Sequence, residues 1–123
     1  MSYAQRLDVT LTTLADGTVT GFIDVQYGRV HTMIYTKDTF ANGVDFTITA
    51  EATGEGIWTE SDVNASKTIA PRQPIHDKVA VASLYADNGQ PVEDYIVLAK
   101  DRIKIVIAAG GNVKKGKFTA VIT

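Results

Sequence analysis

The sequence contains no cysteine, which excludes disulfides, thiolate metal sites and cysteine nucleophiles together. Neither sign of charge dominates, because 12 Lys and Arg stand against 14 Asp and Glu and leave a formal net charge of −2. A chain with this balance is unlike a general binder of nucleic acid or of anionic membranes. We therefore expect no nucleic-acid partner.

Long hydrophobic runs are also missing from the sequence. The longest apolar stretches, residues 95–99 and 105–109, are far below the roughly 20 residues that cross a bilayer. The first residues carry charge at Arg6 and Asp8 and hold no apolar stretch of signal-peptide length. We expect a soluble protein with no membrane partner and no export by a signal peptide.

What the sequence does have is an excess of β-branched residues, since Thr, Val and Ile make up 39 of its 123 residues. Such side chains resist helix and suit a pleated, half-buried surface. The chain has the length of one domain and can bury a core large enough to fold without staples. We expect an all-β single domain over residues 1–123, an antiparallel β sandwich or small barrel of about eight strands.

Alternation of apolar and polar residues places the strands, and turn residues suggest how they pair. Strands are expected at residues 7–13, 18–25, 29–36 and 45–50, with a break at Tyr27-Gly28 and a short apolar stretch at Ile57 and Trp58. Three hairpins are predicted, joining 7–13 to 18–25, 79–85 to 92–98 across Asn88-Gly89, and 102–108 to 117–122. The arm at 79–85 could instead be a short helix, because its alanines permit either.

One long connection interrupts the pattern. Residues 60–76 hold Asn64, Pro71 and Pro74 and show little periodicity. Irregular loops of this length in a compact domain are usually functional or disordered. We interpret the segment 61–74 as an arm that docks on a partner.

Few residues suggest catalysis. Residues 111–117 fit the phosphate-loop spacing G-x-x-x-x-G-K, but Phe118 stands where a magnesium-holding Ser or Thr is required, and a strand follows where a helix must begin. A hairpin tip explains the tract better. The two histidines, His31 and His76, have no cluster of acidic residues around them in the sequence and do not make a zinc or two-metal site. We expect no cofactor, no metal and no enzymatic activity.

Two groups of residues remain as candidates for binding. Basic residues near the C-terminal end form one predicted basic edge on neighbouring strands, made of Lys100, Arg102, Lys104, Lys114, Lys115 and Lys117. This edge either blocks sheet-to-sheet aggregation or contacts an acidic patch on another protein. Trp58 and the five tyrosines either pack in the core and interfaces or stack on a base or a sugar.

From residue 42 to residue 122 the sequence resembles a family of small structural proteins encoded in the head-gene region of tailed bacteriophages. The likeness is carried by short phrases and not by a catalytic signature. The phrases are residues 43–54 (GVDFTITAEATG), 57–64 (IWTESDVN), 71–73 (PRQ), 76–77 (HD) and 94–106 (DYIVLAKDRIKIV), with Gly110-Gly111.

The resemblance implies a non-enzymatic virion protein, assembled in the host cytoplasm, that decorates or cements the capsid and contacts the major capsid protein or another virion protein. It also allows a head–tail connector or tail-associated protein, and the competing class is a carbohydrate- or receptor-binding β-sandwich module. Apolar edge strands predict a homo-oligomer, a trimer on a capsid lattice or a ring at the junction. The residues expected to bind the partner are Ser61, Asn64, Lys67, Pro71, Arg72, Pro74, Lys114, Lys115 and Lys117.

Overall fold

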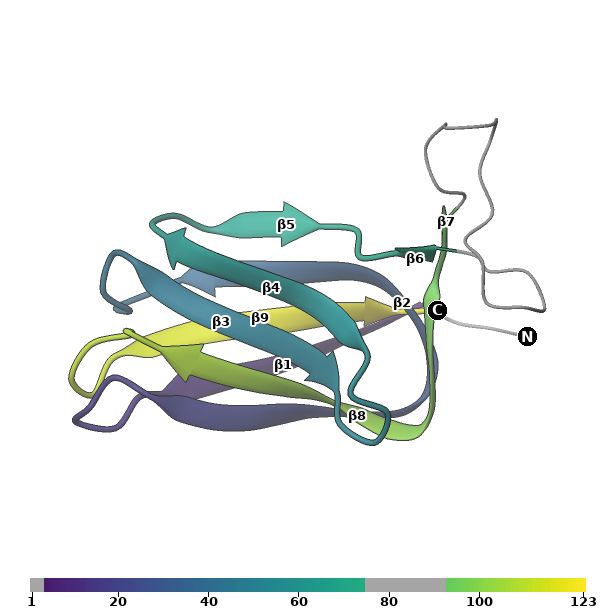
Figure 1. The fold of residues 1–123 in the computed structure, drawn as a ribbon, viewed down its shortest axis with the longest axis horizontal. Helices are drawn as coiled ribbons and strands as arrows, with labels where there is room; N and C mark the ends of the chain where they lie inside the picture. Colours follow the sequence, from purple (N-terminus) through teal and green to yellow (C-terminus); the bar gives the residue numbers. More distant parts are fainter. Residues whose placement is uncertain (1–3, 75–92) are drawn as a thin grey trace.

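The computed structural model describes residues 4–74 and 93–123. This part of the chain contains nine antiparallel strands and no helix (Figure 1). The all-β antiparallel fold expected from the sequence is therefore confirmed. The strands are β1 (Gln5–Thr12), β2 (Val19–Lys37), β3 (Val44–Ala50), β4 (Gly56–Val63), β5 (Lys67–Ile69), β6 (Gln73–Pro74), β7 (Glu93–Asp94), β8 (Ile96–Ala108) and β9 (Lys115–Ile122).

Seven of these strands form one sheet that curls on itself. Its order is β1-β9-β2-β8-β3-β4, with β5 also paired to β2, while β6 and β7 form a separate two-stranded ribbon. The 19-residue β2 is shared between two halves of the sheet. Its residues 19–30 pair with β8, and its residues 30–37 pair with β9. One half thus contains β8, β3 and β4, and the other contains β1, β9 and β5.

The two halves face each other across a single core. Phe46 of β3 and Phe118 of β9 lie on strands that do not pair, yet their rings meet edge to face with centroids 5.2 Å apart. On β8 the alternate residues Ile103, Ile105 and Ile107 are fully buried between the halves. The alternation seen in the sequence therefore separates a core face from a solvent face, as period-2 patterns do.

The shared strand β2 bends where it passes from one half to the other. Gln26 and Gly28 have φ angles of 67° and 144°, and the register against β8 shifts on both sides of Gln26. Gly28 also leaves space for Ile122, because a Cβ at Gly28 would lie 2.3 Å from the Ile122 Cγ2. The break predicted at residues 27–28 is thus a bend inside one strand, and the two strands expected on either side of it are continuous.

The first predicted hairpin is wrong. The segments 7–13 and 18–25 do not pair with each other, since β1 pairs with β9. Leu11 of β1 instead packs face to face on Gly21 of β2, where a Cβ would lie 2.1 Å from the Leu11 Cδ2. The loop between the strands crosses from one half of the sheet to the other, and the absence of a side chain at Gly21 leaves room for Leu11 at this crossing.

The predicted hairpin of residues 102–108 with 117–122 is wrong for the same reason, because β2 lies between β8 and β9 in the sheet. By contrast, β3 lies where a strand is expected at 45–50 and forms a hairpin with β4. The turn expected at Asn88-Gly89 and the arm 79–85 lie outside the described residues.

The prediction of a long irregular loop at 60–76 is largely wrong for the residues of this segment that the structure describes, because strands occupy much of it. Strand β4 continues to Val63, a three-residue arch follows, and Thr68 of β5 pairs with Ile34 of β2. Asp62, with a φ of 57°, interrupts the regular alternation near the end of β4. The side chains of this region are mostly exposed, so no apolar period marks its strands.

Candidate functional site at the loop end

Four connections of the sheet lie together at one end of the molecule, on the left in Figure 1. Strands β1, β4 and β8 and the second half of β2 all run toward this end, and each is followed by a loop that leads into a strand running away from it. We call this surface the loop end and define it as residues 13–18, 38–43, 64–66 and 109–114. The β6–β7 ribbon lies at the opposite end (Figure 1).

Backbone hydrogen bonds join the loops to one another. The Gly110 amide donates to the Gly17 carbonyl at 2.9 Å, which links loop 109–114 to loop 13–18. The Ala41 amide donates to the Gly110 carbonyl at 2.9 Å, which links loop 38–43 to the same loop. Loops tied in this way have few free backbone groups and little freedom to move independently.

Two threonine hydroxyls add further bonds between the loops. Thr13 is 2% exposed, and its Oγ1 donates to the Gly111 carbonyl at 2.6 Å and accepts from the Lys114 amide at 2.8 Å. Thr39 Oγ1 accepts from the Lys115 amide at 2.7 Å. The backbone that carries the two lysines is therefore fixed from both neighbouring loops.

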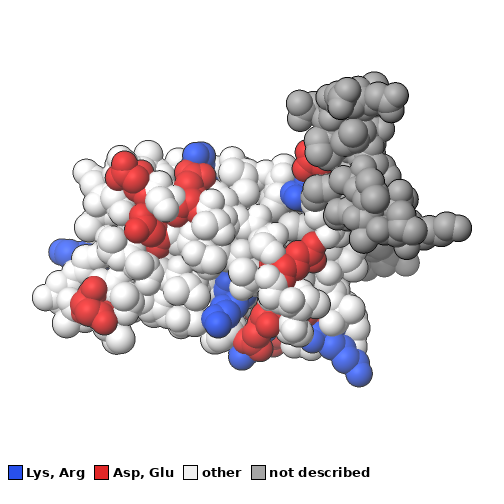
Figure 2. All heavy atoms as spheres, viewed as in Figure 1, with Lys and Arg blue, Asp and Glu red and all other residues white. Residues whose placement is uncertain are grey.

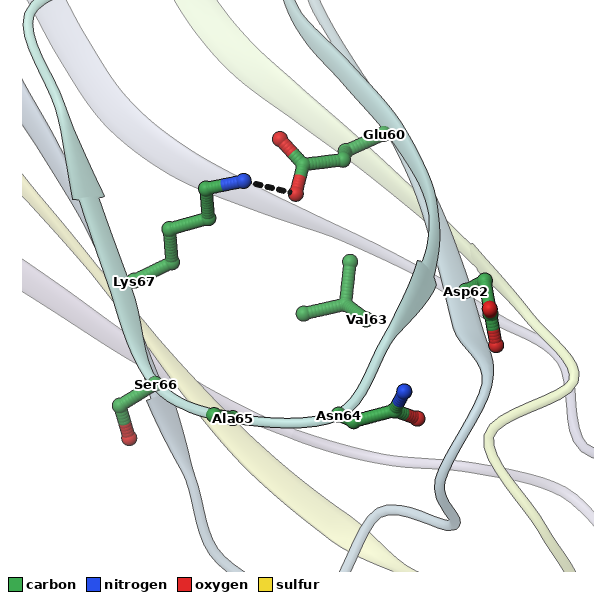
Figure 3. Close-up of a pocket in the computed structure, with 7 residues that line it drawn as sticks. All are labelled: Glu60, Asp62, Val63, Asn64, Ala65, Ser66 and Lys67. Carbon is green, nitrogen blue, oxygen red and sulfur yellow. Dashed lines mark hydrogen bonds and ion pairs between the residues drawn. The ribbon is translucent and has the colours of Figure 1, made fainter.

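The 64–66 arch between β4 and β5 is attached to the same surface. The Gly43 amide donates to Asn64 Oδ1 at 2.7 Å, and the Lys37 amide donates to Ser66 Oγ at 2.8 Å. A shallow hollow of about 360 Å3 lies on this arch (Figure 3). Its lining residues are Glu60, Asp62, Val63, Asn64, Ala65, Ser66 and Lys67.

An ion pair spans the hollow. Lys67 Nζ lies 2.5 Å from Glu60 Oε2 (Figure 3). The Trp58 indole N–H donates to the other carboxylate oxygen at 3.0 Å. The hydrogen bond from Lys67, and next that from Trp58, holds the pKa of Glu60 below its usual value. The carboxylate is therefore ionised at neutral pH and ties β4 to β5 across the gap between the two halves of the sheet.

Two large apolar side chains project from the loop end into solvent. Leu14 is 63% exposed and Val113 is 61% exposed, and the Val113 amide donates to the Leu14 carbonyl at 3.3 Å. Val113 also has a φ of 51°, a left-handed conformation that is strained for a β-branched residue. Strain of this kind persists only where the surrounding structure fixes it, and it is concentrated at functional positions.

The predicted partner-binding residues are divided between the two ends of the molecule. Asn64, Lys114 and Lys115 lie at or beside the loop end, with Lys67 and Ser61 on the strands that flank the arch, and all five side chains are exposed. The structure thus brings together two segments that the sequence places about fifty residues apart.

The other predicted binding residues lie elsewhere. Pro71 is buried and cannot contact a partner as it stands, and Pro74 belongs to β6. Arg72 donates to the His31 carbonyl at 3.0 Å, and its guanidinium stacks 4.2 Å from the Tyr95 ring centroid. These residues therefore lie near the end opposite to the loop end, where β6 and β7 are (Figure 1).

The single basic edge expected from the sequence does not form. Lys117 of β9 lies 3.8 Å from Asp8 of β1, and Arg102 of β8 pairs at 2.8 Å with Glu51. Strand β2 separates β8 from β9, so the two groups of basic residues are not adjacent. Figure 2 shows acidic and basic side chains interspersed over the visible face.

Two further expectations concern aromatic and glycine-rich segments. Trp58 is only 6% exposed, so it is not available to stack on a sugar, and its core packing is an edge-to-face contact with Phe46 at 4.8 Å. After the glycine tract 111–117 no helix begins, because β9 already starts at Lys115.

The apolar pair Leu14 and Val113 was not selected as a candidate from the sequence. A signal was present, because each residue stands beside turn residues, where an apolar side chain has no strand face to cover.

Within residues 4–74 and 93–123 no three His, Asp or Glu residues come close enough to hold a metal ion. In the same part of the chain no helix is long and apolar enough to cross a membrane. Comparison of the sequence with family models and with curated proteins, and of the structure with solved structures, finds no match.

Proposed function

We propose that this chain is a non-catalytic structural protein of a tailed-bacteriophage virion, which docks on the major capsid protein through its loop end. The phage assignment rests on the resemblance of residues 42–122 to head-region structural proteins. The docking surface rests on one observation: four loops, hydrogen-bonded to each other, present Leu14 and Val113 to solvent.

Rigidity is what makes this end suitable for binding. A loop that must be ordered on binding loses about 0.5–1.5 kcal/mol for each side chain that is immobilised, and its backbone loses more. The loop end is already fixed by bonds such as Gly110 to Gly17 and Thr13 to Gly111. Apolar side chains on a fixed surface can therefore be buried by a partner at little cost in conformational entropy.

Lys114 of the loop end and Lys115, the first residue of β9, have a different role in this proposal. Lys114 and Lys115 are exposed and stand beside the apolar pair. Charges at the rim of an interface mainly set the rate of encounter and its dependence on salt, whereas buried anchors set the rate of dissociation. The loop end also exposes the carboxylates Asp16 and Asp38, so the capsid surface that receives it is expected to carry charges of both signs around an apolar depression.

Binding of the purified chain to particles that lack it tests the docking surface. The variant Leu14→Asp with Val113→Asp should weaken binding at least about 30-fold, mainly through faster dissociation, because two anchors of roughly 1 kcal/mol or more are lost. Replacing Lys114 and Lys115 by Glu should slow association at low salt and have less effect at high salt.

Val97→Asp is the matched control, because Val97 is 59% exposed but lies on β8 near the opposite end. It should leave binding unchanged. Equal binding by the Leu14/Val113 variant and the wild type would refute the loop end as the docking surface.

Cryo-electron microscopy of the particle encoded together with this chain tests the virion assignment. Density on the outer capsid lattice supports a decoration or cement protein. Density at the portal vertex supports a head–tail connector, and density on the tail supports a tail-associated protein. Absence of the chain from purified particles would overturn the structural role.

A further inference from the structure

The curled sheet leaves two long strands at the ends of its hydrogen-bonded path. Among the described residues β1 pairs with β9 alone and β4 pairs with β3 alone. The β4 edge is irregular, since Asp62 has a φ of 57° and the register against β3 shifts twice. Irregularities of this kind twist an edge strand away from pairing with another chain.

The β1 edge has no such protection. Its eight residues run opposite β9 without a register shift, from Gln5 opposite Ile122 to Thr12 opposite Lys115. The strand contains no proline and no residue with positive φ. A regular, exposed edge strand presents unpaired N–H and C=O groups that match those of another strand.

The charges of β1 select one such strand, namely β1 of a second copy. When two identical antiparallel strands are related by a two-fold axis normal to the sheet, one residue faces its own copy. Centring the pair on Leu7 places Arg6 opposite Asp8 of the partner subunit, twice. Centring it on Arg6 or on Asp8 places like charges face to face, which is destabilising, and centring it on Val9 gives no opposite-charge pair.

We propose that this chain forms a two-fold dimer in which β1 pairs with β1 of a second copy, centred on Leu7. Within the described residues Arg6 has no ion-pair partner. The Asp8 side chain is 44% exposed, and its Oδ1 accepts from Thr119 Oγ1 at 2.6 Å. Its Oδ2 lies 3.8 Å from Lys117 Nζ, which is too far for a hydrogen bond. The second oxygen is therefore available to a guanidinium from the partner.

The dimer also covers apolar surface at the margin of the core. Leu7 and Val9 point toward the core face but are only partly buried. Pairing of the two β1 strands places the two Leu7 side chains in contact. It also joins the half of the sheet that contains β1 and β9 in one subunit to the same half in the other, which gives one continuous sheet. Because β1 runs toward the loop end, antiparallel pairing directs the two loop ends to opposite poles, so the dimer is independent of the docking surface proposed above.

Charge exchange tests the register. Arg6→Asp should weaken dimerisation about tenfold or more, because each of two attractive pairs becomes a repulsive one, and Asp8→Arg should do the same. The double variant Arg6→Asp with Asp8→Arg should recover the dimer. Lys100→Asp is the matched control, because it makes the same change of charge at an exposed residue of β8 whose φ of 49° suits Asp, and it should leave dimerisation unchanged.

Cysteine cross-linking tests the geometry directly, since the sequence has no cysteine of its own. In the proposed dimer Leu7→Cys brings two Cβ atoms within roughly 5 Å, close to disulfide distance, whereas the copies of Val9→Cys lie about 13 Å apart. Oxidation should cross-link the first variant and not the second. Sedimentation or light scattering gives the oligomeric state, and circular dichroism shows that each variant is folded.

Several results would overturn the proposal. A wild-type monomer at about 1 mM excludes a dimer of useful affinity. A trimer or ring, or a dimer that both single charge variants leave intact, excludes the β1 interface. Cross-linking through Val9→Cys in place of Leu7→Cys excludes the register.

Discussion

Tyr35 offers the sharpest test of the core, because its hydroxyl has no hydrogen-bond partner among the described residues. The residue is 0% exposed, and within the described structure no polar group lies within bonding distance of its Oη. Its ring is surrounded by those of Phe40, Phe46 and Phe118, with centroid distances of 6.2, 5.4 and 5.2 Å. We predict that Tyr35→Phe stabilises the protein.

The magnitude follows from the cost of the unpaired hydroxyl. Burying such a group without a partner costs about 1–3 kcal/mol, and removing one oxygen atom gives up a few dispersion contacts of about 0.1–0.2 kcal/mol each. The free energy of unfolding should therefore rise by about 1 kcal/mol, which corresponds to roughly 3–5 °C in Tm for a domain of this size. In urea the midpoint should increase at an unchanged m-value.

The pH dependence gives an independent check on Tyr35. Burial raises the pKa of its hydroxyl above the ordinary value of 10.0, so above that pH the hydroxyl ionises in the unfolded chain before it ionises in the folded one. The wild type then loses stability with rising pH, by up to about 1.4 kcal/mol per pH unit, until the folded pKa is reached. Tyr35→Phe lacks this loss, so its advantage should widen above pH 10.

Tyr27→Phe is the matched control, because Tyr27 is 63% exposed. It should leave the urea midpoint unchanged. A Tyr35→Phe protein that is less stable than the wild type, or that keeps the wild-type alkaline slope, would show that the hydroxyl has a partner and would refute the reasoning.

Two further substitutions test the loop end and the arch. Gly116→Ala should cost about 1–3 kcal/mol of stability, because its Cβ would lie 2.3 Å from the buried Phe40 ring, whereas Gly56→Ala, with no atom within 4 Å, should stay within about 0.5 kcal/mol. Comparable melting temperatures for these two variants would contradict the packing described here. Glu60→Gln should cost about 0.5 kcal/mol at pH 7, a value small because the pair with Lys67 is partly exposed. Since the folded pKa of Glu60 lies below its ordinary 4.5, this difference should vanish as pH falls through the folded pKa, and a difference that persists at pH 2 would argue against the ion pair.

Strand positions follow from the sequence wherever a strand has one buried face. On β8 the alternation of Ile103, Ile105 and Ile107 with polar or smaller residues is enough to predict both the strand and its core face. Pairing does not follow in the same way. A loop that crosses between facing halves and a loop that closes a hairpin contain the same turn residues, as Asp16-Gly17 shows, so the partner of β1 could not be chosen from local pattern.

The candidate site was predictable only in part. The sequence shows that Lys114, Lys115 and Asn64 are polar residues in or beside turns. Their proximity to one another depends on the crossing loops and therefore on the tertiary fold. The exposure of Leu14 and Val113 is likewise a tertiary property, because an apolar residue beside a turn is buried in many other folds.

The place of β9 between β1 and β2 has a consequence for the order of events during synthesis. Strand β1 leaves the ribosome before the other described strands, but its only partner among them is β9, which emerges about a hundred residues later. At roughly 5–20 residues per second, β1 waits about 5–20 s with both of its edges unpaired. The sheet can therefore close only after β9 has been synthesised, and folding depends on that interval being free of competing strands.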